Sequence, residues 1–131
     1  MKRAIILLAL ATPTLAADAA LLDAIKAVES GGDSSAVGDN GKSLGAYQIG
    51  KAYWSDATKH GKVKWDYKAG VKDDAKCKQV IRWYWKRYAP KNATKETKAR
   101  IHNGGPKGHK KKATEKYWAK VKKAMEKGGA Q

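Results

Sequence analysis

Cys77 is the only cysteine in this chain of 131 residues, so no internal disulfide can form. A domain of this size without cross-links must be held together by a single apolar core, and it is too short to build two. Aromatic residues for such a core are present as five Trp and six Tyr, without any Phe. Cys77 itself lies in a stretch of helical periodicity and has no histidine beside it in sequence, so we expect a buried structural thiol.

The first sixteen residues have the pattern of a secretory signal peptide. Lys2-Arg3 provides a positive start, residues 4–11 are uniformly apolar, and Thr14–Ala16 supplies small residues for a cleavage site. The segment is too short to span a bilayer, and no later segment is apolar enough to do so. We therefore expect a signal peptide over residues 1–16, one domain over residues 17–131, and export to the periplasm or the extracellular space.

The domain is mostly helical by its apolar periodicity. Four segments carry apolar side chains at three- and four-residue intervals: residues 18–28, 73–89, 94–102 and 114–127. A fifth segment, residues 45–60, predicts one helix or two short ones, whereas residues 61–70 and 103–112 are expected to be loops. Asn40-Gly41 is a turn signal, with Val37 and Leu44 allowing only a tiny hairpin. The fold class predicted is α+β, mostly α, with a small loop or hairpin after the first helix.

The chain is strongly basic. Removing Lys2 and Arg3 with the signal peptide from the 28 basic residues leaves 26 against 12 acidic ones, a net charge of +14. Such a charge attracts polyanions over long distances, and for an exported protein these are cell-wall polymers, anionic lipids and extracellular nucleic acid. The runs Lys107–Lys112 and Lys120–Lys127 are equally consistent with a solvated basic surface that binds nothing in particular.

Glu29 lies beside the apolar face of the first predicted helix and is followed by Ser30–Gly32, and Asp39 comes next in a turn-rich loop. A sheltered carboxyl group can stay protonated as a general acid. A more hydrated one stays ionised and supports an oxocarbenium-like transition state. The pair has the composition of a carbohydrate-cleaving site. On spacing alone, Glu29 is as readily an ordinary helix-terminal acid and Asp39 a turn residue.

Several motifs occur in one order along nearly the whole mature chain: Val28–Gly31, Ser43–Ile49, Ala52–Asp56, Arg87–Ala89, Ala99–Gly108, and Thr114 followed by Tyr117–Val121. In this order they resemble the invertebrate-type lysozymes, the destabilase family of glycoside hydrolases. The resemblance implies a lysozyme-like fold and hydrolysis of the β-1,4 bond between N-acetylmuramic acid and N-acetylglucosamine in peptidoglycan. The family's members are typically rich in disulfides. This chain has none, which is typical of a bacterial relative.

The resemblance also implies roles for individual residues. Glu29 matches the family's general acid. Asp39 best fits its second carboxylate, read as nucleophile or stabiliser of a retaining reaction. The loop between Glu29 and Gln48 looks slightly shorter than the family's, so Asp39 aligns only across a gap, and Asp33 and Asp56 are the other acids within reach.

Further site candidates follow from polarity and position. Gln48 and Asn103 are expected to bind sugar groups or to orient Glu29, while Gly104 lets the backbone approach the glycan closely. His102 either acts near Glu29 or packs in the core. Aromatic and hydroxyl side chains complete the substrate-binding candidates, with core packing as the alternative for both aromatic rings: Ser43, Tyr47 and Trp54. Ser30 has no adjacent base and is expected to support the site by hydrogen bonding.

Two other functions share parts of this pattern. Glu-Ser, Gly-x-x-Gln and the segment His102–Pro106 also fit soluble lytic transglycosylases, which use one glutamate and leave a 1,6-anhydro product. An inert wall- or polyanion-binding module on the same fold would explain the charge equally well. Specific nucleic-acid binding is not expected, because no recognisable reading motif is present.

No metal or cofactor site is expected. His60, His102 and His109 lie far apart and lack ligand-like spacing to each other or to the cysteine. The expected partners are peptidoglycan strands and the anionic wall surface, and the expected state is a monomer.

Overall fold

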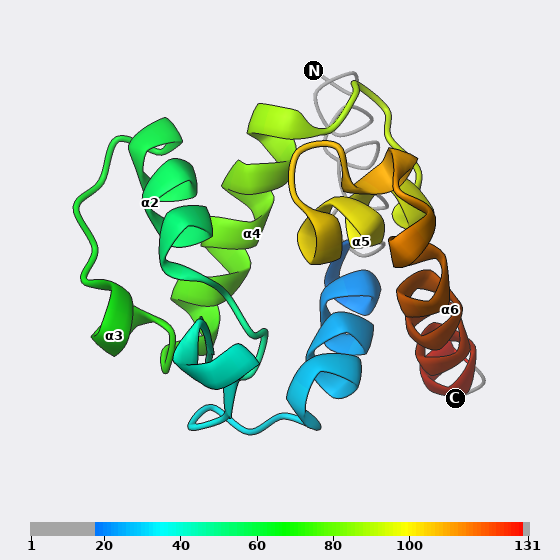
Figure 1. Ribbon diagram of the computed structural model, residues 1–131, viewed down its shortest axis with the longest axis horizontal. Coiled ribbons are helices and arrows are strands. Elements are labelled where there is room, and N and C mark those ends of the chain that lie inside the picture. Colours follow the sequence, from blue (N-terminus) through cyan, green and yellow to red (C-terminus); the bar gives the residue numbers. More distant parts are fainter. Residues whose placement is uncertain (1–17, 130–131) are drawn as a thin grey trace, which may run out of the picture.

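The computed structural model describes residues 18–129, and the predicted signal peptide therefore lies outside the described residues. Figure 1 shows the longest internal helix, α4 (Asp74–Tyr88), with α2 (Lys51–His60) on one side. On its other side lie a first helix over residues 18–30, α5 (Lys95–Gly104) and α6 (Glu115–Gly129). The helices enclose a single core, as a short chain without disulfides requires.

The first helix buries one face and ends just after Glu29. Leu21, Leu22 and Ile25 are fully buried, which confirms the predicted amphipathic pattern. Gly31 follows with φ of +69°, and its N–H donates to the carbonyl of Ala27 at 3.0 Å. A glycine in this left-handed conformation is a common helix C-terminal cap. It leaves the Glu29 side chain in the last turn, at the edge of the core.

A very short hairpin follows, as predicted. Strands β1 (Val37–Gly38) and β2 (Ser43–Leu44) are antiparallel, with Val37 opposite Leu44. They are joined through the 3₁₀ turn η1 (Asp39–Gly41), in which Asn40 is left-handed with φ of 57° and ψ of 40°. This is the conformation that the Asn-Gly signal predicts.

The second predicted helix begins later than expected. Residues 45–48 form a turn, Ile49 makes a single bridge to Leu44, and α2 begins only at Lys51. The predicted loop over residues 61–70 also contains one helical turn, α3 (Tyr67–Gly70), capped by the Asp66 carboxylate. The apolar pattern correctly predicted that Tyr47 and Ile49 are buried, but it predicted a helix over residues 45–48, which form a turn.

The remaining helices agree with their predicted ranges to within a few residues. Asp73 caps α4 and Thr94 caps α5, the latter as predicted. Between α5 and α6 the chain forms two short 3₁₀ turns, η2 (Gly108–Lys110) and η3 (Lys112–Thr114). No helix among residues 18–129 is long and apolar enough to cross a membrane.

The core gathers side chains from every helix longer than one turn. Its largest fully buried members are Tyr47, Leu21, Leu22, Ile25, Ile49, Ile81, Ile101, Val80, Val121 and Cys77. The Cys77 thiol faces the carbonyls of Gly70 and Val71, and burial raises its pKa to about 12. The expectation of a buried structural thiol is therefore confirmed.

Candidate functional site

The Glu29 carboxyl group is held at the edge of the core by two side chains from distant parts of the sequence. Its side chain is 17% exposed. The Tyr117 hydroxyl, from the first turn of α6, donates to Glu29 Oε2 at 2.9 Å. His102 Nε2, from the last turn of α5, lies 3.4 Å from the same oxygen. Both neighbours therefore lie on the Oε2 side, and Oε1 accepts no hydrogen bond from the described residues.

His102 has a defined tautomer because of its two hydrogen-bond partners. Nε2 lies 2.9 Å from the Tyr47 carbonyl oxygen, which can only accept, so Nε2 carries a hydrogen. Nδ1 lies 2.9 Å from the Tyr53 hydroxyl, which donates to it when the ring is neutral. The side chain is only 1% exposed. With both ring nitrogens occupied by Tyr47 and Tyr53, His102 lies beside Glu29 without offering a free base.

The tyrosines around Glu29 are firmly protonated. Burial raises the pKa of Tyr117 far above its ordinary value, and the negative charge of Glu29 and the hydrogen bond to it add to the shift. Burial also raises the pKa of Tyr53, with further contributions from neighbouring Tyr84 and Glu29. Both hydroxyls are therefore hydrogen-bond donors over the whole physiological range and cannot serve as bases.

Ser30 ties the end of the first helix to the turn after the hairpin. Its hydroxyl donates to the Ala46 carbonyl at 2.8 Å and accepts from the N–H groups of Gly32 and Asp33 at 3.1 and 3.0 Å. The expectation that Ser30 is a hydrogen-bonding support is confirmed. These bonds fix the loop that carries Asp39 relative to the helix that carries Glu29.

Asp39 is exposed on η1 and has a different environment from Glu29. Its backbone is left-handed, with φ of 49°, and its Oδ2 accepts a hydrogen bond from Ser43 Oγ at 2.7 Å. Among the described residues, no hydrogen bond or ion pair joins Asp39 to Glu29, Tyr117 or His102. The structure thus brings Glu29 together with His102, and Asp39 with Ser43, as two separate pairs.

The aromatic candidates are core residues. Tyr47 is 0% and Trp54 2% exposed, and the Trp54 indole N–H donates to the Trp65 carbonyl at 2.9 Å. Neither ring offers a face to a sugar, so for both the alternative of core packing is correct. The Tyr47 backbone still contributes to the site, because its carbonyl accepts from His102.

The remaining polar candidates lie around this cluster. Gln48 donates from Nε2 to the carbonyls of Gly45 and Ala36 at 3.0 and 3.3 Å, so its amide braces the turn. Asn103 is exposed, directly after His102 at the end of α5. Gly104 is half-buried, and a Cβ there would lie 2.6 Å from Thr114 Cγ2. Asn103 is therefore the member of this group whose side chain is free to reach a ligand.

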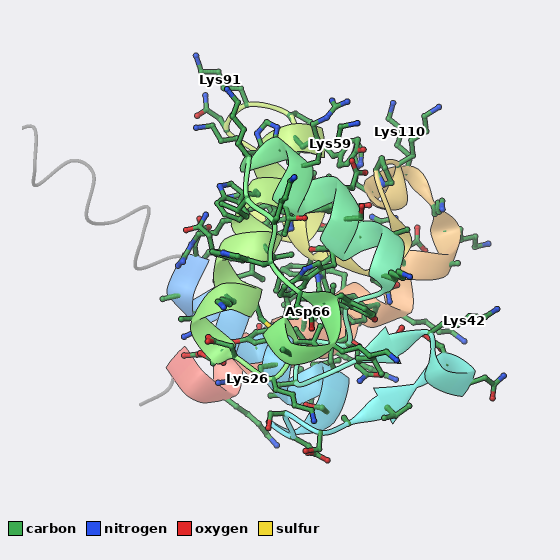
Figure 2. The ribbon with its side chains drawn as sticks, turned by 90° about the vertical axis from the view of Figure 1, so that its left-hand side faces the viewer. Lys26, Lys42, Lys59, Asp66, Lys91 and Lys110 are labelled. Carbon is green, nitrogen blue, oxygen red and sulfur yellow. The ribbon has the colours of Figure 1, made fainter. Side chains whose placement is uncertain are left out.

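A cleft of about 680 Å³ opens next to Tyr53, between the hairpin and the N-terminal end of α2. Its walls are formed by Gly41, Lys42, Leu44, Gly50, Lys51, Ala52, Tyr53, Asp66, Tyr67 and Lys68. Figure 2 faces this side of the molecule, with Asp66 near the centre and Lys42 at the edge. Since Tyr53 also bonds His102, the cleft is connected through one side chain to the Glu29 cluster.

Within residues 18–129, no three side chains of His, Cys, Asp or Glu gather in a way that would hold a metal ion. The site consists of one carboxyl group held by a phenol hydroxyl and flanked by an imidazole, which suits proton transfer by the carboxyl group.

A family model described as Destabilase matches residues 18–124, most of the chain. The chain belongs to the Destabilase family. Two of its relatives are named lysozyme. The one from Magallana gigas is 40% identical over 82 residues, covering 60% of this chain and 58% of its own length. The one from Ostrea edulis is 42% identical over 89 residues, covering 63% and 62%. This chain thus matches about three fifths of the length of these two relatives.

Solved structures confirm the fold. The Meretrix lusoria lysozyme, solved in complex with PliI of Aeromonas hydrophila, has a TM-score of 0.70 at 34% identity. That match covers 79% of this chain and 87% of the other. The Tapes japonica lysozyme has a TM-score of 0.67 at 34% identity, over 78% and 85% of the two chains. The predicted lysozyme-like, mostly helical fold with a small hairpin is therefore correct.

Tyr117 and Tyr53 are the two site residues that the sequence did not single out for function. Tyr117 falls on the apolar face predicted for the last helix, and Tyr53 on that of the second. A hydroxyl among core positions is the signal that could have found them, because a buried tyrosine needs a hydrogen-bond partner.

Proposed function

We propose that this protein is an exported muramidase that hydrolyses the β-1,4 bond between N-acetylmuramic acid and N-acetylglucosamine in peptidoglycan. One observation carries the proposal: the largely buried Glu29 carboxyl group, which accepts a hydrogen bond from Tyr117 at Oε2 and is flanked by His102. Membership of the Destabilase family and relatives named lysozyme support the same activity.

Glu29 is the general acid of the proposed reaction. Because Tyr117 donates to Oε2, the proton of the neutral carboxyl sits on Oε1, the oxygen that accepts no bond from the described residues. Oε1 gives this proton to the glycosidic oxygen as the bond to the anomeric carbon breaks. The resulting carboxylate then takes a proton from the water that completes hydrolysis.

Asp39 is the proposed second carboxylate. Its carboxylate accepts from Ser43 through Oδ2, which leaves Oδ1 free to approach the positively charged anomeric carbon. In the retaining reaction, Oδ1 forms the glycosyl bond as the leaving group departs, and water later breaks it. The glycan passes Glu29 and continues into the cleft beside Tyr53, with Asn103 as a further polar contact.

Replacing Glu29 tests the proposal directly. Glu29→Gln keeps the size of the side chain but removes the transferable proton, so turnover of purified peptidoglycan should fall about a thousandfold or more. Binding to the wall should persist. Asp23→Asn is the matched control, because it changes an exposed acid on the same helix and should keep full activity. Activity retained in Glu29→Gln would rule the mechanism out.

The digestion product separates the enzyme classes. Hydrolysis gives muropeptides with free reducing ends, whereas a lytic transglycosylase gives 1,6-anhydro products that are lighter by one water. Asp39→Asn should lower the rate of hydrolysis about a hundredfold or more. If Asp39→Asn is active and the products are anhydro sugars, Glu29 works alone. A parent protein that binds walls without releasing any fragment would be an inert module.

Export has its own test. N-terminal sequencing of the protein recovered outside the cytoplasm should begin at Ala17, directly after the predicted cleavage site.

A further inference from the structure

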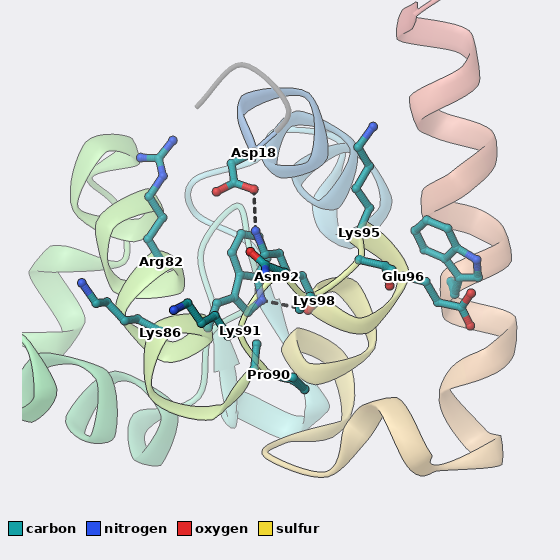
Figure 3. Close-up of a pocket in the computed structure, with 14 residues that line it drawn as sticks. Asp18, Arg82, Lys86, Pro90, Lys91, Asn92, Lys95, Glu96 and Lys98 are labelled. Carbon is teal, nitrogen blue, oxygen red and sulfur yellow. Dashed lines mark hydrogen bonds and ion pairs between the residues drawn. The ribbon is translucent and has the colours of Figure 1, made fainter. Parts of the chain in front are cut away.

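A groove of about 1180 Å³ lies away from the Glu29 cluster, where α4 ends and α5 begins (Figure 3). It is lined by the end of α4, the connecting loop, the first turns of α5, and two side chains from elsewhere, Asp18 and Trp118. None of Glu29, Tyr117, His102 or Tyr53 lines it.

More cationic than acidic side chains line this groove. Two acids lie in it, and each is already paired. Lys98 Nζ lies 2.9 Å from Asp18 Oδ1, and Arg100 lies 2.7 Å from Glu96 Oε2. Four further lining cations form no ion pair with any carboxylate of the described residues: Arg82, Lys86, Lys91 and Lys95.

These four cations lie around the groove. Arg82 and Lys86 are one helical turn apart and stand together on the α4 side, while Lys95 rises from α5 on the other (Figure 3). The Arg82 Nε–H is buried and has no hydrogen-bond partner among the described residues. A buried donor without a partner is costly, and a shift of the Arg82 side chain toward an anion bound in the groove would satisfy it.

The groove lining also contains four apolar side chains: Trp85, Ala89, Pro90 and Ala93. Trp85 is only 4% exposed, and its indole N–H donates to the Lys98 carbonyl at 2.8 Å. A lining that combines apolar side chains with cations suits a narrow chain of carbon units that carries anionic groups at intervals. A single small anion would fill only a fraction of the volume.

We propose that this groove binds a phosphodiester-linked polyol chain, a polyanion of the kind attached to cell walls. Lysine and arginine are the usual phosphate ligands in proteins. A duplex nucleic acid fits less well, since the groove is lined by the sides of two helices and a loop, and not by one helix that could enter a duplex groove. Single-stranded nucleic acid is bound by stacking bases on several exposed rings, and here only Trp118 is half-exposed. The choice of a wall polymer rests on the proposed function.

Such binding would anchor the protein to the wall through one face and leave the Glu29 face free. Anchoring raises the local concentration of glycan without any new contact at the cleavage site. The groove would thus be one specific binding site for the polymer on a surface that is basic overall.

The test measures binding of labelled poly(glycerol phosphate) to the purified protein at low salt. The groove variant is Lys86→Gln, Lys91→Gln and Lys95→Gln combined. Its control is Lys59→Gln, Lys110→Gln and Lys122→Gln, which removes the same charge from exposed side chains outside the groove. Lys59 and Lys110 project into solvent in Figure 2. The groove variant should bind about tenfold or more weakly, with a salt dependence shallower by about two ions. The control should stay within about twofold.

Two results would overturn the proposal. Equal losses in both variants would mean that the charge acts as a diffuse field. Single-stranded DNA that binds as tightly as the polymer, and loses the same affinity in the groove variant, would make this a nucleic-acid site. Walls stripped of their phosphate polymers separate this inference from the proposed function: parent and groove variant should digest them equally. A parent that binds the polymer but digests no wall would refute the muramidase proposal alone.

Discussion

Glu29 is flanked by a tyrosine hydroxyl that stays protonated near neutral pH and by a histidine whose two ring nitrogens both have partners. The raised pKa of Tyr117 keeps its hydroxyl as a donor to Oε2, and His102 is fixed by the Tyr47 carbonyl and the Tyr53 hydroxyl. The carboxyl group therefore has one oxygen engaged with the protein and one directed to other partners. Such an arrangement orients the proton before substrate arrives, which is what a general acid needs.

Tyr117→Phe tests this orientation without disturbing the ring packing. Removal of the hydroxyl frees Oε2 and lets the carboxyl rotate, so kcat should fall about tenfold, in line with the loss of a hydrogen bond to a carboxylate. KM should change little, because the Tyr117 hydroxyl orients Glu29 and is not proposed to bind the substrate. The measurement is steady-state digestion of peptidoglycan at several pH values.

Tyr88→Phe is the matched control, because the Tyr88 hydroxyl donates to Asp56 instead of Glu29. It should keep kcat near the parent value. A Tyr117→Phe protein with parental kcat, or one whose loss lies wholly in KM, would show that the hydroxyl does not position the acid.

The sequence predicted the acid better than its surroundings. Glu29 and His102 were both singled out, since local motifs contain them, and the structure brings them together. Tyr117 is 88 residues from Glu29, and no local pattern shows that α6 delivers its hydroxyl there. Tyr47 and Trp54 illustrate the opposite error, because an aromatic ring near a motif suits a binding platform and a core equally well.

At the scale of elements, local patterns predicted the helices and the hairpin, and tertiary contacts decided the exception. Residues 45–60 space their apolar side chains as a helix would, yet the first part forms a turn. Gly45 and Gln48 have positive φ values of 83° and 52°, and Ser30 holds the Ala46 carbonyl. These contacts come from distant segments, so they leave no periodic trace in the sequence.

Gly45→Ala tests how tightly this turn is docked. A Cβ at Gly45 would lie 2.3 Å from the Val71 carbonyl oxygen, and the positive φ disfavours any side chain. Clash and strain together should lower the free energy of unfolding by about 3 kcal/mol, observed as a melting temperature roughly 10 °C lower.

Gly128→Ala provides the comparison, because a Cβ there meets nothing within 4 Å and Gly128 lies in α6. Its stability should stay within about 1 kcal/mol of the parent, with alanine favoured in a helix. A parental melting temperature for Gly45→Ala would mean that the turn can move away from Val71.

At the scale of the whole molecule, a chain of net charge +16 holds together without a disulfide. The apolar core provides the main stabilisation, and a few acids link separate segments through cations. Asp74 is the most connected of these. It accepts from the Tyr47 hydroxyl at 2.7 Å and pairs with Lys26 of the first helix and Lys78 of α4, each at 3.1 Å.

These contacts make stability depend on pH. Partial burial acts to raise the pKa of Asp74, but hydrogen bonds from Tyr47, Lys78 and Lys26 outweigh it and lower the pKa from 3.8 to about 2. The folded protein therefore binds this proton less tightly than the unfolded chain. The stabilisation is complete above about pH 4 and is lost as the pH falls through 2. Because the side chain is 48% exposed, solvent screening reduces the contribution to about 1 kcal/mol.

Asp74→Asn should accordingly lower the free energy of unfolding by about 1 kcal/mol at pH 7, measured by urea denaturation. The difference from the parent should stay nearly constant down to about pH 4 and shrink markedly by pH 2, where about half of the folded parent molecules carry a protonated Asp74. Asp23→Asn makes the same charge change at an exposed position of the first helix that forms no ion pair among the described residues, and should change the free energy of unfolding at pH 7 by less than about 0.5 kcal/mol. The pairing of Asp74 with Lys26 and Lys78 needs an ionised carboxylate and weakens when that carboxylate is protonated. A difference in stability that persists unchanged at pH 2 would therefore come from the packing of the side chain and not from its charge.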